Sequence, residues 1–239
     1  MRRAESREAF HARLTDARRI SQLEGLVLKR VFDISAALLL LVAAAPILFL
    51  AAILIKLDSD GPVLFIQTRM GRNFRCFQLI KLRTMKAGCD GSAYTLGPDT
   101  RITSVGKWLR WMKFDELPQL WNVLRGEMSL VGPRPVIPAL AMEFHEAYSV
   151  LLAVRPGLTD PATMRYCRES QLLALVPEPL AYFKAVLTPR KLQISAAYLQ
   201  HATVLTDLGI LAGTALALFS FRRPNAGKPI VENVGHSAI

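Results

Sequence analysis

Residues 34–55 read ISAALLLLVAAAPILFLAAILI, a run of twenty-two residues without a charged side chain. A helix needs roughly 20 apolar residues to cross the hydrocarbon core of a bilayer, so the run is long enough to cross. It begins too far from Met1, and is too long, for the apolar part of a cleaved signal peptide. The run therefore indicates a membrane protein.

The sequence is compatible with two paths of this run through the bilayer. Residues 1–30 carry eight Lys and Arg against four Asp and Glu, and residues 62–135 carry twelve against five. Basic flanks favour the cytoplasmic side, and a spanning helix would place one of them outside. Pro46 lies near the middle of the run, and proline bends or breaks a helix. The alternatives are a single spanning helix and a re-entrant helix, broken near Pro46, that enters and leaves by the cytoplasmic face.

Composition narrows the classes of protein further. The chain has 239 residues and a formal net charge of +11, which predicts an anionic partner such as nucleic acid, a phospholipid surface or a phosphorylated substrate. Hydrophobic residues make up 51%, too many for a disordered tail. Three cysteines without a CxxC pair, and four scattered histidines, exclude a disulfide framework and disfavour a zinc site.

The remaining patterns predict an α+β fold that is mostly α. We expect a basic amphipathic leader at 1–28, the membrane helix at 29–58, a larger domain at 59–222 and a tail at 223–239. Within the domain, 63–69 and 74–83 read as the strands of a hairpin. Helical spacing of apolar residues begins at Thr103, and another helix is expected from Asp115. The apolar stretch 208–221 is short for a span and is expected to lie on the membrane surface or in the core.

The pair Asp115-Glu116 stands among cations and aromatic residues, in KWLRWMKFDELPQLWNVLRG (107–126). Helix capping explains it simply, because acidic residues stabilise the start of a helix and Pro118 is tolerated there. A helix start also binds phosphate, and a carboxylate beside cations and Mg²⁺ can attack a phosphoryl group. Both explanations stay open on the pattern alone.

Several cations lie beside turns or expected helix ends. In Gly-Pro-Arg-Pro (132–135), two prolines restrict the backbone around Arg134, whose planar guanidinium suits phosphate oxygens. The motif therefore indicates either a phosphate contact or a plain turn without a binding role. Lys81, Arg83, Arg110 and Arg155 are further candidates, although each alone is typical of a solvated surface charge. Walker A, GxGxxG and GxSxG patterns are absent from the sequence.

Taken together, these motifs resemble the bacterial sugar transferases, the monotopic phosphoglycosyl transferases that act on polyprenyl phosphate. The run Lys-Arg-Val-Phe-Asp at 29–33, including Lys29, Arg30 and Asp33, resembles the family's entry to its membrane helix. The densest likeness is DELPQLWNVLRGEMSLVGPRP at 115–135, and Arg-Pro-Gly-Leu-Thr at 155–159 completes it. The resemblance covers roughly residues 25–215.

The resemblance implies a reaction and a place for it. Family members move a sugar 1-phosphate from a nucleotide diphosphate sugar to polyprenyl phosphate, release the nucleoside monophosphate, and start the assembly of exopolysaccharide, capsule, O-antigen or glycoprotein glycans. It implies Asp115 as the nucleophile, Glu116 as its partner, both near Mg²⁺, and a cytoplasmic-face location on the bacterial inner membrane. The implied phosphate contacts are Lys81, Arg83, Arg110, Arg134, Arg155 and Arg168; the implied membrane residues are Lys29, Arg30, Asp33 and Pro46.

Two positions depart from the family pattern. The helix break is usually Ser-Pro and is Ala45-Pro46 here, so a serine hydroxyl that would assist the bend is missing. Cys167 stands where an arginine is expected, and Arg165 or Arg168 is the candidate substitute.

Two other functions are compatible with parts of the sequence. A membrane-anchored nucleic-acid-binding protein would use the +11 charge, but no known binding module is present, so no nucleic-acid partner is expected. A degenerate transferase scaffold would fit the departures at Ala45 and Cys167, but the acidic pair is intact.

Overall fold

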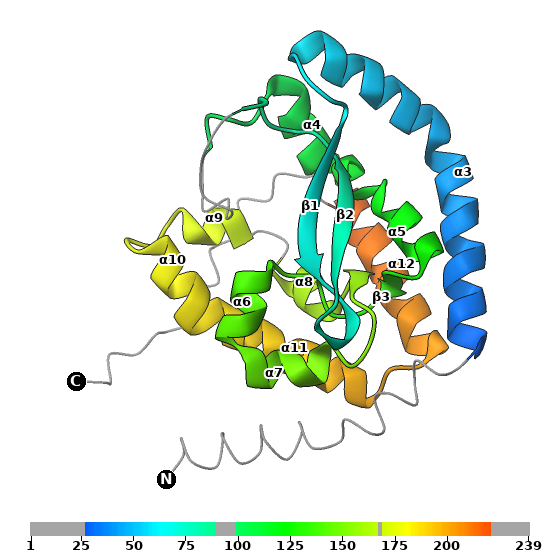
Figure 1. Ribbon diagram of the computed structural model, residues 1–239, viewed down its shortest axis with the longest axis vertical. Helices are drawn as coiled ribbons and strands as arrows, with labels where there is room; N and C mark the ends of the chain where they lie inside the picture. Colours follow the sequence, from blue (N-terminus) through cyan, green and yellow to red (C-terminus); the bar gives the residue numbers. More distant parts are fainter. Residues whose placement is uncertain (1–26, 89–98, 167–168, 221–239) are drawn as a thin grey trace.

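The protein is mostly helical, with two small sheets (Figure 1). The computed structural model describes residues 27–88, 99–166 and 169–220. These ranges leave out nearly all of the expected leader and the whole of the expected tail. They also leave out Cys89, Cys167 and Arg168. The mostly helical α+β prediction is therefore confirmed for the described part of the chain.

The apolar run forms one long helix, α3 (Val27–Asp58), which curves along one side of the molecule (Figure 1). The helix continues through Pro46, so the expected break of the helix is not observed. By length and composition α3 is able to cross a membrane, and it is the one such helix in the described residues. The re-entrant path stays a prediction.

One narrow face of α3 packs against the rest of the protein. Asp33, Ala37, Ala44, Ala51 and Ile55 are buried, at spacings of four and seven residues that place them along one stripe. The large apolar side chains point elsewhere: Leu39, Val42, Phe49 and Leu57 are among those that are exposed. Three of these five buried residues are alanines, whereas many of the large apolar side chains of α3 face outward.

The predicted hairpin is confirmed within one or two residues at each end. β1 (Leu64–Met70) pairs antiparallel with β2 (Cys76–Leu82), with Leu64 opposite Leu82. The short 3₁₀ turn η1 (Arg72–Phe74) connects them, and Asn73 takes the left-handed conformation with φ 54°. Its backbone N–H donates to the carbonyl of Leu152 at 2.6 Å, which ties the hairpin tip to the helical part.

The next helices follow the prediction in part. α4 (Ser104–Met112) begins where expected, and the hydroxyl of its N-cap Thr103 accepts from the backbone N–H of Gly106. A further helix is present as predicted, but its expected start at Asp115 is wrong. Lys113 turns left-handed, the 3₁₀ turn η2 (Phe114–Glu116) follows, and α5 (Gln119–Arg125) starts only after Pro118. The acidic pair therefore lies in a connection and caps no α-helix.

A second sheet was not predicted. β3 (Ser129–Val131) pairs in parallel with β4 (Gly157–Thr159), although each has only three residues. The remaining elements are α6 (Pro138–Glu143), α7 (His145–Leu151), α8 (Pro161–Arg165), α9 (Glu169–Leu173), α10 (Pro179–Tyr182), the π-helical turn η3 (Phe183–Leu187), α11 (Thr188–Gln200) and α12 (Val204–Ser220).

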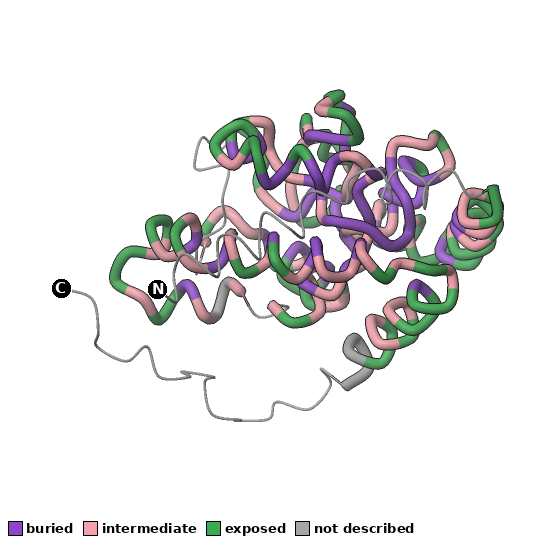
Figure 2. The backbone as a smooth tube through the Cα atoms, turned by 90° about the horizontal axis from the view of Figure 1, so that it is seen from below, coloured by how far each residue is buried: buried purple, intermediate pink, exposed green. Residues whose placement is uncertain are grey.

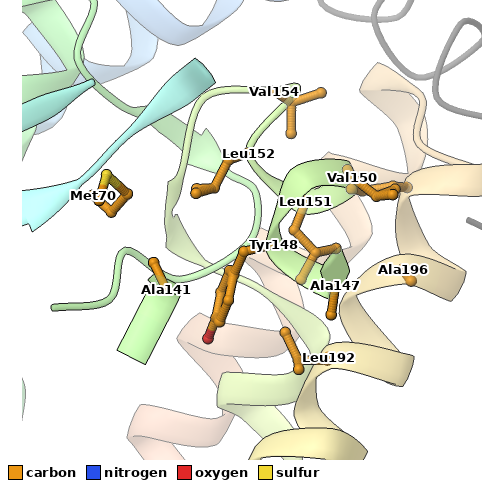
Figure 3. Packing of buried hydrophobic residues seen from close by; sticks show 11 residues of the cluster. Met70, Ala141, Ala147, Tyr148, Val150, Leu151, Leu152, Val154, Leu192 and Ala196 are labelled. Atoms are coloured by element: carbon orange, nitrogen blue, oxygen red, sulfur yellow. The ribbon is translucent and has the colours of Figure 1, made fainter. Parts of the chain in front are cut away.

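Buried residues gather in the middle of the molecule, and α3 lies at its side (Figure 2). One cluster joins Met70 of β1 to Tyr148 and Leu151 of α7 and Leu192 of α11 (Figure 3). A second joins Ala37 of α3 to α5, β2 and β3. Through this second cluster the apolar helix is packed directly onto the elements around Asp115.

Candidate active site

Asp115 and Glu116 lie in η2, between the end of α4 and the start of α5. The left-handed Lys113 (φ 59°) ends α4 by turning the chain. Glu116 is partly buried, and Asp115 is buried. The tight turn places two adjacent carboxyl groups away from bulk water and beside strand β2.

Glu116 pairs with Arg134, which follows β3 in the sequence. The two guanidinium nitrogens of Arg134 donate to the two carboxylate oxygens of Glu116, one of them at 3.1 Å. Lys81 of β2 forms an ion pair with the same carboxylate, and its Nζ lies 3.9 Å from Oε1 of Glu116. Burial alone would raise the pKa of Glu116, but the charges of Arg134 and Lys81 outweigh it and hold that pKa well below its usual range. Glu116 is therefore ionised, and its charge raises the pKa of Arg134.

Asp115 has a different environment from its neighbour. Its Oδ1 is buried and accepts no hydrogen bond within the described part of the chain. Burial, and then the charge of Glu116, raise its pKa, against the opposing charges of Lys81, Lys113 and Arg110. A carboxylate oxygen held among cations without a hydrogen bond is poorly solvated, and such an oxygen is a stronger nucleophile than a hydrated one.

Lys81 and Arg110 complete the cluster around the acidic pair. Burial lowers the pKa of Lys81 to about 8, although Glu116 opposes that shift. Burial also lowers the pKa of Arg110, and Asp115 opposes it. Arg110 Nε donates to the hydroxyl of Thr84 at 2.8 Å, which fixes the guanidinium beside β2. The structure therefore brings together five of the predicted site residues: Lys81, Arg110, Asp115, Glu116 and Arg134.

Arg83 does not join this cluster. It is buried, and its guanidinium donates to the carbonyls of Asp60 and, at 2.6 Å, of Ser59. These carbonyls follow the end of α3, where a helix leaves backbone acceptors without partners. The contacts of Arg83 thus explain how α3 ends and give no sign of the predicted phosphate contact.

One backbone contact of Arg155 lies outside this cluster. Arg155 precedes β4, and its Nε donates to the carbonyl of Gly126, just after α5, at 2.8 Å. Arg168 lies outside the described residues, as does Cys167. Their predicted roles in substrate binding stay predictions.

The charged residues expected at the membrane bind the protein instead. Lys29 pairs with the buried Asp207 of α12 and donates to the carbonyl of Val131 at 3.2 Å. Arg30 donates to the carbonyls of Val123, at 2.9 Å, and Leu124 near the end of α5. Asp33 accepts from the backbone N–H of Leu130 at 3.1 Å. These three side chains attach the first turns of α3 to α12, α5 and β3.

Asp115 fits a magnesium ion better than Glu116 does. Mg²⁺ is usually bound by one or two carboxylates together with substrate phosphates, so it does not need a cage of protein ligands. Oδ1 of Asp115 has no hydrogen bond, whereas both oxygens of Glu116 accept from Arg134. No group of three or more His, Cys, Asp or Glu side chains that could hold a metal ion occurs among residues 27–88, 99–166 and 169–220.

Two residues of the site were missed in the sequence. Thr84 accepts the hydrogen bond of Arg110; it lies within the range 25–215 that the resemblance covers, but it has no charge that would mark it as a site residue. Asn122 is fully buried in α5 and bonds to β2. The sequence offered one signal for the role of Asn122: it is a polar residue between the apolar Leu120 and Val123.

Comparison with known proteins identifies close relatives. A sequence model of a family described as bacterial sugar transferase matches residues 24–221. The chain is 49% identical over 149 residues to the undecaprenyl-phosphate glucose phosphotransferase of Komagataeibacter xylinus, covering 59% of this chain and 28% of the relative. It is 47% identical over 156 residues to the exopolysaccharide production protein PSS of Rhizobium leguminosarum bv. phaseoli, covering 60% and 76%.

A third relative is the UDP-glucose:undecaprenyl-phosphate glucose-1-phosphate transferase of Caulobacter vibrioides. It is 50% identical over 146 residues, which cover 59% of this chain and 54% of the relative. The chain thus matches only about a quarter to a half of two of these relatives, and about three quarters of the Rhizobium protein.

Proposed function

Since the chain belongs to the bacterial sugar transferase family, we propose that it is a phosphoglycosyl transferase that moves a sugar 1-phosphate from a nucleotide diphosphate sugar to undecaprenyl phosphate. The observation that carries the proposal is the buried Asp115 oxygen without a hydrogen bond, next to the ion pair of Glu116 and Arg134. This arrangement offers a nucleophile and fixed cations to a diphosphate.

In the first step, a carboxylate oxygen of Asp115 attacks the phosphorus that bears the sugar. The new bond joins this oxygen to phosphorus, and the bond from phosphorus to the nucleoside monophosphate breaks. The nucleoside monophosphate leaves with the electron pair, and a phosphosugar-aspartyl intermediate remains. The raised pKa of Asp115 means that the step requires a pH at which this carboxyl has lost its proton.

In the second step, a phosphate oxygen of undecaprenyl phosphate attacks the same phosphorus. The bond between phosphorus and Asp115 breaks, and the carboxylate is restored for another cycle. The product is the sugar joined to the lipid through a diphosphate. Splitting the transfer into two displacements lets one site serve a water-soluble donor and a lipid acceptor in turn.

The cations around Asp115 stabilise the charge of the transferred phosphoryl group. Lys81, Arg110 and Arg134 come from β2, α4 and the segment after β3, so they approach the carboxylate from different elements. Fixed cations act strongly where water is excluded. Glu116 has the distinct role of holding Arg134 in one orientation through a two-point contact.

We propose Mg²⁺ as the cofactor, held by Asp115 together with phosphate oxygens of the donor. When bound, the ion would neutralise negative charge on the diphosphate. Glu116 was predicted as a second metal ligand, but its pairing with Arg134 favours a positioning role.

Membrane association of the proposed enzyme is supported by α3 and α12. α3 directs its large apolar side chains outward. On α12, Leu205, Leu208, Ala212 and Leu216 are exposed along one face, while Asp207 points inward to Lys29. An apolar outer face and a polar inner contact are the reverse of a helix on a water-soluble protein. We propose that both helices contact phospholipid at the cytoplasmic face of the inner membrane.

α4 and α5 offer a further contact with the headgroups. Trp108 and Trp111 of α4 and Trp121 of α5 are exposed, and tryptophan is enriched at the boundary between membrane and water. These helices flank η2, so such a contact would keep Asp115 at headgroup depth, where a lipid phosphate can reach it.

We propose a uridine diphosphate sugar as the donor, because the Caulobacter relative is described as acting on UDP-glucose. The description of the Rhizobium relative supports a role in exopolysaccharide production. The same first reaction serves capsule, O-antigen or glycoprotein glycan assembly.

The test is the release of uridine monophosphate by the purified full-length protein. It is incubated with undecaprenyl phosphate, Mg²⁺ and a panel of donors that includes UDP-glucose and UDP-N-acetylgalactosamine. We expect release with at least one donor, and loss of release in Asp115→Asn. With donor alone, mass spectrometry of the intact protein should show the added sugar phosphate on the wild type and not on the variant.

Full activity of Asp115→Asn would refute the nucleophile. If no donor of the panel supports release by the wild type, the proposed reaction is refuted and a degenerate scaffold becomes the better explanation. Lipid vesicles provide the accompanying control, because Asp115→Asn should bind them as the wild type does.

A further inference from the structure

Asn122 lies fully buried in the middle of α5, and all groups of its side-chain amide are used. Nδ2 donates to the backbone carbonyl of Gln78 at 2.7 Å and to Oε2 of Glu127 at 2.7 Å. Oδ1 accepts from the backbone N–H of Ile80 at 3.1 Å. A buried amide with both donors and its acceptor satisfied holds one orientation.

The two backbone partners of Asn122 belong to the free edge of β2. Among the described residues β1 and β2 form a two-stranded sheet, so one edge of β2 has no neighbouring strand there. Consecutive residues of a strand direct their N–H and C=O groups to opposite edges. Gln78 and Ile80 are two residues apart, so their backbone groups point to the same edge. The amide of Asn122 therefore meets this edge as the N–H and C=O of one residue in a third strand would.

This contact connects the two elements that carry the site. Lys81 directly follows Ile80 in β2, and α5 begins three residues after Glu116. Across the site, Lys81 Nζ lies 3.9 Å from Oε1 of Glu116. Because Asn122 binds the strand at Ile80, a shift of α5 along β2 would break its hydrogen bonds before Lys81 could leave the acidic pair.

We propose that Asn122 is a positioning residue for the transfer reaction: its amide holds β2 against α5 and so fixes Lys81 beside Asp115 and Glu116. This inference rests on the proposed function. Apolar packing alone does not require an amide here, since Leu79, Leu120 and Val123 already fill the adjacent core. A leucine at 122 would remove the partner of the partly buried C=O of Gln78 and N–H of Ile80.

The inference predicts a change in how Lys81 titrates. The charged groups that face it are Arg69 of β1, Asp115 and Glu116 of η2, and Arg134 after β3. Burial is the largest influence and holds its pKa at about 8. If the strand moves away from α5, water reaches Lys81, and its pKa rises toward the ordinary 10.5.

The experiment compares Asn122→Asp and Asn122→Leu with the wild type, as full chains in lipid nanodiscs. Asn122→Asp keeps the size and the acceptor but removes the donors and adds a charge facing Glu127. We expect kcat/KM for uridine monophosphate release to fall at least tenfold in both variants, and the alkaline decline of its pH profile to move upward by about one pH unit. NMR of isotopically labelled lysine should show the same upward shift for Lys81 without any turnover.

Tyr198→Phe is the matched control. It removes a buried hydrogen bond to Asp207, remote from Lys81, and should lower thermal stability without moving the alkaline decline. If Asn122→Asp folds and both the decline and the Lys81 titration stay at their wild-type positions, the positioning role is refuted. If Asn122→Leu does not fold, Asn122→Asp decides alone. A wild type without activity refutes the proposed function, while the Lys81 titration still tests the positioning.

Discussion

Glu116 receives hydrogen bonds from both guanidinium nitrogens of Arg134, a residue eighteen positions further along the chain. The contact joins η2 to the segment that follows β3 and orients a cation beside Asp115. Of the two adjacent acidic residues, Glu116 is therefore held in an ion pair, and Asp115 has a buried oxygen without a hydrogen bond in the described part of the chain.

We expect Arg134→Lys to reduce kcat by about tenfold or more, even though the charge is kept. Lysine is a point charge and cannot reproduce the planar two-point contact with Glu116. The measurement is uridine monophosphate release under saturating donor. Arg125→Lys is the matched control, because the side chain of Arg125, which pairs with Glu127 at 3.2 Å, is 53% exposed, and an exposed pair contributes about 0–1 kcal/mol. Equal losses in both variants would contradict a special role of Arg134.

The pH dependence of kcat/KM should be bell-shaped. On the acid side, activity appears as Asp115 loses its proton, at a pH above the ordinary aspartate value of 3.8 because its pKa is raised. On the alkaline side, activity falls around pH 8 as Lys81 loses its proton and its positive charge. kcat/KM is the suitable quantity because it reports the free enzyme.

Lys81→Arg provides the control for the alkaline limb. Arginine stays charged throughout the accessible range, so any activity that the variant retains should not decline near pH 8. A decline at the same pH in Lys81→Arg would assign that limb to another group.

Arg83→Ala should destabilise the fold by about 2 kcal/mol, since a buried guanidinium that bonds to carbonyls at the end of α3 is lost. Thermal unfolding measures the loss, and KM for the donor should stay unchanged in the folded fraction. Arg75→Ala, at an exposed position, is the control and should change neither quantity. A raised KM with unchanged stability would instead support the phosphate contact expected from the sequence.

Asp207→Asn should destabilise the protein by about 3–5 kcal/mol, because Lys29 is left as a largely buried cation without its partner. The double variant Lys29→Met with Asp207→Leu should recover most of that stability. Both are compared by thermal unfolding in nanodiscs, and both should still bind lipid. An unaltered unfolding temperature in Asp207→Asn would show that the pair does not hold α3 to α12.

The sequence alone determined the local features. The apolar run, the strand-like stretches 63–69 and 74–83, and the spacing of apolar residues from Thr103 are each signals within one short segment, so they predicted α3, β1, β2 and α4. The proposed catalytic pair, Asp115 and Glu116, also came from the sequence, through its resemblance to a family.

Only the tertiary structure decided how the charges are paired. Lys29 and Arg30 read as membrane flanks and Arg83 as a phosphate contact, yet all three bind protein groups far away in the chain. The parallel pairing of β3 with β4 and the amide contact of Asn122 are also long-range. A charge or an amide is compatible with many partners, and its partner is fixed only when folding buries it, because an unpaired polar group away from water is too costly to keep.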